Sequence, residues 1–208
     1  ATVYPYALRF VRNVARLTAR GVPTVEILEY ARCPVMHWYD FLGMGISLFL
    51  AIAGSTILNM WYDHDIDTVM NRTHNRPLAA GTVGLREALR LGLVLSLLGV
   101  GLAIMMDPLY GLVVFAGLFF DVVVYTIWLK RKTCWSIVWG GVSGGMPILA
   151  GRVLAIGGID LIGILLTLAI LFWIPTHILT FSMRYYDDYK AADVPTFPST
   201  YGFAFTRA

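Results

Sequence analysis

Residues 40–62 decide the fold: they read DFLGMGISLFLAIAGSTILNMWY, and only Asp40 among them is charged. A helix rises about 1.5 Å per residue, so a run of this length crosses the roughly 30 Å hydrocarbon core of a bilayer. Apolar segments of similar length follow at 85–106, 108–129, 135–156 and 160–183. The sequence therefore predicts an all-α, polytopic membrane protein.

The composition supports this prediction. Hydrophobic residues make up 58% of the chain and charged residues only 14%, and the mean hydropathy is +0.69. Segment 135–156 is the least apolar, because it contains Gly140, Gly141, Gly144 and Gly145. These glycines indicate either close packing on neighbouring helices or a kinked segment. The two cysteines, Cys33 and Cys134, are too few for a disulfide framework or a cysteine-bound metal cluster.

An acidic and basic stretch begins where the first apolar segment ends, and residues 59–78 read NMWYDHDIDTVMNRTHNRPL. If the helix continues, Asn59, Asp63 and Asp67 lie four residues apart on one face, while Asp65 points elsewhere. Like charges at this spacing repel each other. A divalent cation removes the conflict, and Mg²⁺ suits one or two carboxylates together with substrate phosphates.

Arg72 and Arg76 follow one and two turns later. A guanidinium group presents a planar fork of donors that matches phosphate oxygens. The stretch therefore predicts a Mg²⁺-diphosphate site at the edge of a membrane.

A second acidic cluster begins where the segment 160–183 ends, and residues 184–195 read RYYDDYKAADVP. By itself such a charge run indicates a solvated loop. Together with the first cluster it favours a paired site, in which Asp187 and Asp188 face the first motif across a cavity and share Mg²⁺ with it.

The positive charges are distributed unevenly between the two sides of the predicted bundle. One side carries Arg72, Arg76, Lys130, Arg131, Lys132, Arg184, Lys190 and Arg207. The opposite side carries only Arg152. By the positive-inside rule, the first side is cytoplasmic, and both acidic clusters lie on it.

Residues 1–36 depart from this pattern. They hold Arg9, Arg12, Arg16, Arg20 and Arg32 but no segment long enough to span. One more crossing near residue 35 would place these arginines in the cytoplasm. We therefore expect a cytoplasmic amphipathic segment over 1–36 and a membrane domain over 37–208, from which a first helix and C-terminal helices are missing. The alternative is a short protein whose N-terminal segment lies on the membrane surface.

The polar stretch 59–78 resembles the first Asp-rich motif of the intramembrane UbiA-type prenyltransferase superfamily and, within it, of the enzymes that farnesylate haem. Three further stretches agree in order: YTIWLKRKT at 125–133, IVWGGVSGGMP at 137–147, and DYKAADVP at 188–195, which is preceded by His177. Asp187 stands where the family has a lysine.

The resemblance implies a helix bundle around a central cavity that opens at the cytoplasmic side. It implies Mg²⁺-dependent transfer of a farnesyl group from farnesyl diphosphate to a vinyl group of haem B, giving haem O in the cell membrane. The implied partners are these two substrates, the lipid bilayer, and haem A synthase or a terminal oxidase complex, with no nucleic acid.

The resemblance also implies the site residues. The metal ligands would be Asn59, Asp63, Asp67, Asp187 and Asp188. The catalytic residues would be Asp63, Asp67, Asp188 and Tyr125. The substrate contacts would be Asn59, Arg72, Arg76, Thr126, Lys130, Arg131 and His177.

Several alternatives stay open. An enzyme of the same superfamily could act on a quinone precursor, a chlorin or a glycerol phosphate. A transporter or a non-catalytic subunit of a respiratory complex would need acids strung across the membrane, yet the acids other than Asp121 lie at or beyond the ends of the predicted spans. Intramembrane carboxylates are functional or paired, so Asp121 either faces the cavity or forms a structural pair. His177 either forms a structural hydrogen bond or contacts the substrate.

Overall fold

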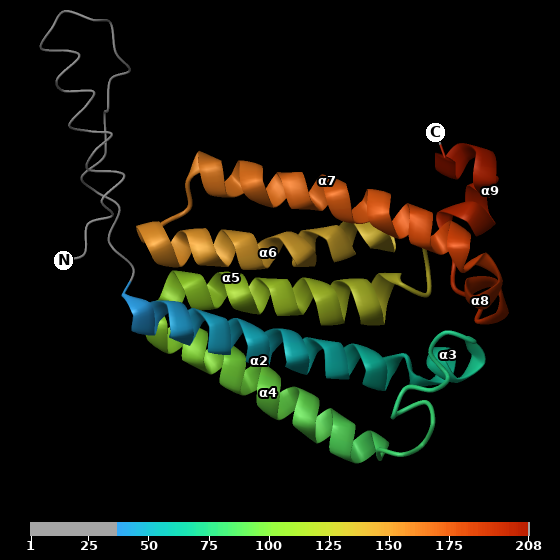
Figure 1. The fold of residues 1–208 in the computed structure, drawn as a ribbon, viewed down its shortest axis with the longest axis horizontal. Helices are drawn as coiled ribbons and strands as arrows, with labels where there is room; N and C mark the ends of the chain where they lie inside the picture. The colour runs from blue at the N-terminus through green and yellow to red at the C-terminus, as the bar shows by residue number, and fades with distance from the viewer. Residues whose placement is uncertain (1–36, 208) are drawn as a thin grey trace, which may run out of the picture. The chain divides into compact units, whose positions relative to one another are not determined.

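The computed structural model describes residues 37–207, and in this part of the chain it is all-α, without a β-strand. Five helical spans are long and apolar enough to cross a membrane. They are α2 (Trp38–Tyr62), α4 (Leu85–Met106), α5 with its continuation (Pro108–Leu129), α6 (Ser136–Ile156) and α7 (Leu161–Arg184). These spans match the five predicted segments, and Figure 1 shows them side by side. The predictions about residues 1–36, and about an additional crossing near residue 35, lie outside the described residues.

The third span changes its helical form halfway. Helix α5 (Pro108–Phe119) begins at Asp107, whose side chain accepts a hydrogen bond from the Tyr110 N–H at 2.8 Å. From Phe120 to Leu129 the backbone is a π-helix, η2, with hydrogen bonds between residues five apart. The Lys130 N–H, for example, donates to the Tyr125 carbonyl at 2.8 Å. The π-helix was not predicted from the sequence.

Small residues bring α2 and α4 together. The buried residues of α4 are Ala88, Gly92, Ser96, Gly99 and Ala103. A Cβ atom added at Gly99 would lie 2.4 Å from the backbone nitrogen of Ala51 on α2. Such close approach lets two backbones pack directly against each other, as small residues do in membrane bundles.

The glycines of α6 have the same role. A Cβ atom at Gly145 would lie 2.8 Å from the Thr167 side chain on α7, and one at Gly141 would lie 3.2 Å from the Leu171 carbonyl. Gly140 instead lies against Tyr125, and a Cβ atom added at Gly140 would lie 3.4 Å from the Tyr125 ring. These contacts support the close-packing alternative for this segment.

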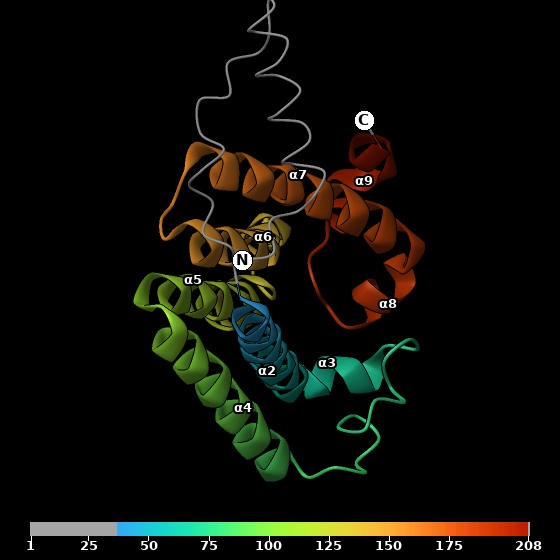
Figure 2. The same ribbon diagram turned by 60° about the vertical axis from the view of Figure 1, so that its left-hand side comes forward.

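The two ends of the bundle differ. One end carries the short helices α3 (His64–Val69), α8 (Tyr186–Ala191) and α9 (Phe197–Arg207), and α3 and α8 face each other there (Figures 1 and 2). The other end carries the α6–α7 connection, where Arg152 forms an ion pair with Asp160 at 2.6 Å. Both acidic motifs therefore lie at the same end, as predicted.

We predict that Gly99→Val destabilises the bundle and Gly101→Val does not. A side chain at position 99 meets the backbone of Ala51, which cannot rotate away, whereas nothing lies within 4 Å of a Cβ at Gly101 on the same helix. Overpacking of this kind costs about 1–3 kcal/mol or more. Thermal unfolding of both variants in detergent measures the difference, and equal midpoints would contradict the close contact.

Candidate functional site

The first acidic motif lies where α2 gives way to α3. Helix α2 does not continue unbroken through the motif. It ends at Tyr62, and Asp63 joins it to α3. The one-turn spacing survives this junction, because the Asp63 N–H donates to the Asn59 carbonyl and the Asp67 N–H donates to the Asp63 carbonyl, both at 2.9 Å. Asp63 and Asp67 are therefore both buried, whereas the Asp65 side chain is 54% exposed. The predicted division between these carboxylates is confirmed in geometry.

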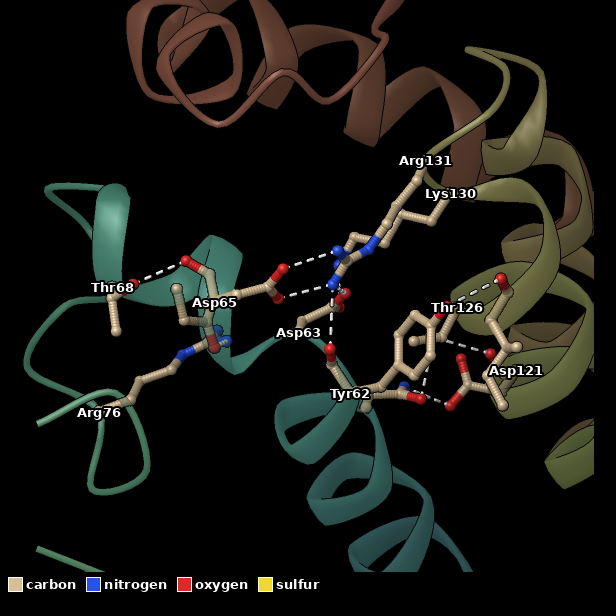
Figure 3. A network of polar contacts seen from close by, with 12 residues as sticks. Tyr62, Asp63, Asp65, Thr68, Arg76, Asp121, Thr126, Lys130 and Arg131 are labelled. Atoms are coloured by element: carbon tan, nitrogen blue, oxygen red, sulfur yellow. Dashed lines mark hydrogen bonds and ion pairs between the residues drawn. The ribbon is translucent and has the colours of Figure 1, made fainter. Parts of the chain in front are cut away.

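Each carboxylate of the motif has a cationic partner (Figure 3). Asp63 forms a short ion pair with Lys130, which follows the π-helix. Asp67 accepts a hydrogen bond from Arg76 at 2.8 Å. Asp65 accepts two hydrogen bonds from the guanidinium of Arg131, both at 2.7 Å. Three basic residues predicted as substrate contacts thus pair with the acids of the first motif.

The electrostatics separate the buried carboxylate from the exposed one. Burial raises the pKa of Asp63 above its usual value, and the opposing effects of Lys130 and Arg131 do not cancel this. The hydrogen bonds from Arg131 lower the pKa of Asp65 to about 2. Oδ1 of Asp63 is buried and accepts no hydrogen bond, and the Arg131 guanidinium forms an ion pair with it at 3.6 Å. A buried oxygen without a donor is costly, so this atom is suited to a positively charged ligand.

A cavity of about 310 Å³ opens beside the motif. Its walls come from α3, the loop after it, the π-helix, α7 and α8. The predicted site residues that line it are Asp67, Arg72, Arg76, Tyr125, Lys130 and His177. The structure thus brings residues from four separate sequence stretches to one polar cavity at the end of the bundle.

Aromatic rings hold the Arg72 side chain in this cavity. Its guanidinium carbon lies 4.7 Å from the centre of the Phe181 ring, 5.3 Å from Tyr185 and 5.9 Å from Tyr189. A guanidinium over aromatic faces is attracted by the ring quadrupoles. These rings were not predicted as site residues, although their spacing of four residues could have indicated one face of a helix.

His177 belongs to the same aromatic row. Its ring is stacked on Trp173 with 5.6 Å between the ring centres, and it lies 6.4 Å from the Phe181 ring. The imidazole is exposed at the cavity wall. Its placement is therefore compatible with a contact to a flat substrate.

Asp188 contacts the first motif directly, through the loop residues Asn71 and Arg72 and not through the carboxylates of that motif. Its carboxylate accepts hydrogen bonds from the Asn71 N–H at 3.3 Å, the Asn71 side-chain amide at 3.1 Å and the Arg72 N–H at 3.2 Å. It is 8% exposed, whereas the neighbouring Asp187 is exposed to solvent. Asp188 thus ties α8 to the loop that carries Arg72.

The five predicted metal ligands do not form a single centre. Between residues 37 and 207, no three His, Cys, Asp or Glu side chains are grouped closely enough to hold a metal ion. The physical reason is that Asp188 binds loop donors, Asp187 lies outside the cavity, and Asn59 is engaged elsewhere. Only Asp63 and Asp67 remain together.

Asn59 and Thr126 form a polar network inside the membrane domain. The Asn59 amide donates to Oδ2 of Asp121 at 2.8 Å, and its oxygen accepts from the Thr126 hydroxyl at 2.9 Å. Ser55 donates to the same Asp121 oxygen in a short hydrogen bond. Thr126 is fully buried and, like Asn59, does not line the polar cavity. Both predicted site residues therefore lie behind the cavity wall.

A second cavity, of about 240 Å³, lies among α2, α5, the π-helix and α6. Its lining is largely apolar and includes Leu48, Ile52, Val114 and Leu118. Asp121 and Ser55 are part of its wall. The network around Asp121 thus lies between the apolar cavity, which Asp121 and Ser55 line, and the wall of the polar cavity.

We predict that Asp188→Ala loosens the loop that carries Arg72. The substitution leaves three donors without an acceptor, at about 1–3 kcal/mol for each one that stays buried. Hydrogen exchange at the Asn71 and Arg72 amides should accelerate. Asp187→Ala is the matched control, because this neighbour is exposed. Unchanged exchange in the Asp188 variant would argue against the contact.

Known proteins include relatives with similar sequences and a solved structure with a similar fold. The chain is 47% identical over 164 residues to a protein from Archaeoglobus fulgidus named protoheme IX farnesyltransferase, with 79% of this chain and 58% of the relative covered. A protein of the same name from Korarchaeum cryptofilum is 44% identical over 177 residues, covering 85% of this chain and 60% of the relative. The chain therefore spans about three fifths of the length of these relatives.

A solved structure of a UbiA homolog from Archaeoglobus fulgidus, bound to DMAPP and Mg²⁺, superposes with a TM-score of 0.72 at 20% identity. The alignment covers 96% of this chain and 70% of that one. The corresponding structure bound to GPP and Mg²⁺ gives a TM-score of 0.68 at 21% identity. These structures show that the fold is shared.

Residues 23–208 match the UbiA prenyltransferase family. This match covers more than half of the chain, and the sequence relatives and the shared fold agree with it. The chain belongs to the UbiA prenyltransferase family.

Proposed function

We propose that this protein transfers a farnesyl group from farnesyl diphosphate to a vinyl group of haem B in the membrane, with Mg²⁺ as the metal. The observation that carries the proposal is the polar cavity, in which Arg72, Arg76 and Lys130 converge beside the buried carboxylates Asp63 and Asp67. The names of the relatives, protoheme IX farnesyltransferase, support the choice of haem as the acceptor.

The carboxylates of the first motif fit a magnesium ion. Mg²⁺ in proteins is bound by one or two carboxylates together with substrate phosphates and water. Oδ1 of Asp63 has no hydrogen-bond donor, and Asp67 lines the cavity. We infer that these two residues hold the ion. When bound, Mg²⁺ supplies positive charge that neutralises the diphosphate.

The basic residues are placed to receive the leaving diphosphate. Lys130 and Arg76 are neutralised by Asp63 and Asp67 in the structure, so binding of a metal by these acids makes both cations available to phosphate oxygens. Arg72 pairs with aromatic rings instead of a carboxylate. Fixed positive groups around developing oxyanions are usually the largest single contribution to catalysis.

The reaction follows from this arrangement. The bond between C1 of the prenyl chain and the diphosphate oxygen breaks, and the electron pair leaves with the diphosphate. The vinyl group of haem then attacks the allylic cation, and water captures the resulting carbocation with loss of a proton. Tyr125 lies at the cavity wall with its ring 5.8 Å from the Lys130 ammonium. The apolar cavity beyond it provides space for the prenyl chain away from water.

Asp188 serves this site by positioning Arg72. Its carboxylate holds the Arg72 backbone while the aromatic rings of α7 and α8 hold the guanidinium. Direct binding of a metal by Asp188 would compete with its three hydrogen bonds to the loop for the same two oxygens. The exposed row formed by Trp173 and His177 is the surface that we propose for the flat acceptor.

The polar end faces the cytoplasm in this proposal. Residues 37–207 contain five helices that can span a membrane. The end with α3 and α8 carries the basic loops, whereas the opposite end carries Arg152. The positive-inside rule then assigns the polar end to the cytoplasmic side.

The catalytic assignment predicts that Asp63→Ala and Asp67→Ala each reduce farnesylated haem formation by about 100-fold or more, a loss typical of a charge-stabilising group. Asp65→Ala should retain most of the activity, because this side chain is exposed and pairs only with Arg131. Product formation with Mg²⁺ in excess measures all three variants. Near-normal activity of Asp67→Ala together with loss in Asp65→Ala would reverse the assignment.

The topology predicts opposite labelling of two single cysteines. In a background without Cys33 and Cys134, a cysteine at position 72 should react with a membrane-impermeant maleimide only from the cytoplasmic side. A cysteine at position 152 should react only from the outside. The reverse pattern would invert the orientation without changing the fold.

A further inference from the structure

Asp121 is an acidic side chain inside a membrane-spanning segment, at the start of the π-helix. Ser55 and Asn59, both on α2, donate hydrogen bonds to its Oδ2 atom. Its Oδ1 atom accepts no hydrogen bond from the described residues. Because Asp121 belongs to the wall of the apolar cavity, this second oxygen is available to whatever occupies that space.

No positively charged group neutralises Asp121 within residues 37–207, where every ion pair involves other acids. Its partners Ser55 and Asn59 are neutral donors, which hold the carboxylate in place without supplying a positive charge. An intramembrane carboxylate is expensive and rarely persists without a function or a partner. The network explains the position of Asp121 but leaves its charge unbalanced.

The π-helix sets the direction of this carboxylate. Nine residues separate Asp121 from Lys130, which is two and a half turns of an α-helix and would place the two on opposite faces. In a π-helix, residues about five apart are hydrogen-bonded neighbours, so Asp121, Tyr125 and Lys130 follow one another along one face. Asp121 lines the apolar cavity, whereas Tyr125 and Lys130 line the polar one.

Residues of α2 also follow one another from the apolar cavity to the polar end of the bundle. Ser55 lines the apolar cavity, Asn59 lies in the network, and Asp63 pairs with Lys130. From Ser55 to Asp63 the helix rises by about 12 Å, at 1.5 Å per residue. A prenyl diphosphate with its head among Arg72 and Lys130 would thus extend its chain from the diphosphate toward Asp121.

We propose that Asp121 is a further catalytic residue, which stabilises the positive charge that develops on the prenyl chain as the diphosphate leaves. This inference rests on the proposed function. The carbon–oxygen bond breaks with both electrons going to the diphosphate, and the Asp121 carboxylate faces the allylic cation that remains from the side away from the diphosphate. Asp121 forms no bond and transfers no proton.

The physical basis is the unequal environment of the two product charges. The leaving diphosphate is met by Arg72 and Lys130, but the cation is left in an apolar cavity where water cannot stabilise it. A fixed negative charge acts strongly in such surroundings, because the attraction between opposite charges grows as the dielectric constant falls. Asp121 supplies that charge in the cavity wall.

The test compares Asp121→Asn with wild type in the purified membrane protein. Diphosphate release from farnesyl diphosphate is followed by rapid quench with haem B and Mg²⁺ present, and affinity is measured separately with farnesyl thiolodiphosphate, an unreactive analogue. We expect the rate of release to fall about 100-fold, as for loss of a charge-stabilising group, while the affinity changes less than about threefold. Asp107→Asn is the matched control, since Asp107 caps the far end of the same span; it should leave both quantities unchanged.

A loss of affinity with a normal rate of release would show that Asp121 acts only by holding Asn59, and would overturn the proposal. Asp121→Glu provides a second variant, because it keeps the negative charge and moves it by one methylene group. The proposal requires the Glu variant to release diphosphate faster than the Asn variant, so equal rates would refute it. Should wild type itself release no diphosphate, the proposed function fails instead, which keeps the two failures distinct.

Discussion

A buried carboxylate at the edge of a membrane needs a positive partner, and the pair between Asp63 and Lys130 meets this need across 67 residues of sequence. Breaking a buried pair by removing one partner typically costs about 3–5 kcal/mol, because the other charge is left uncompensated. The contact therefore fixes the end of α2 against the end of the π-helix. The second pair, between Asp67 and Arg76, joins the loop after α3 to that helix, and it contributes less because the Arg76 side chain is 40% exposed and is screened by water. The polar cavity lies between these two anchored segments.

The same constraint explains why the acids of the first motif differ in environment. Asp63 and Asp67 lie on the inner face and pair with groups around the cavity, whereas Asp65 lies on the outer face, where Arg131 binds it with both nitrogens of its fork. Exposed ion pairs contribute little to stability because water screens them. The inner pairs thus build the site, and the outer pair only secures the connection between α2 and the loop after the π-helix.

The membrane spans, and the separation of Asp63 and Asp67 from Asp65, could be predicted from the sequence. Apolar length predicts each span, and the spacing of four residues predicts that Asp63 and Asp67 share a face. The role of Asp188 was not predictable, because its partners Asn71 and Arg72 lie more than a hundred residues away. The apolar residues of the third span gave no indication of π geometry either, since hydrophobicity alone does not fix backbone register. The set of metal ligands stays a prediction, because carboxylates counted along the chain do not reveal which donors already bind them.

The tie between α8 and the loop after α3 has a consequence for the wall of the polar cavity. Small residues bring the backbones of α2 and α4 together, and glycines do the same for α6 and α7, so each of these pairs is closely packed. At the polar end, the three hydrogen bonds of Asp188 connect α8, which follows α7, to the loop after α3, which follows α2. At a net value of about 0.5–1.5 kcal/mol each, these bonds favour the assembled arrangement of α8 and the loop by a factor of roughly 10 to 1,000. The position of Arg72 in the cavity wall therefore depends on a carboxylate that lies 116 residues away in the sequence.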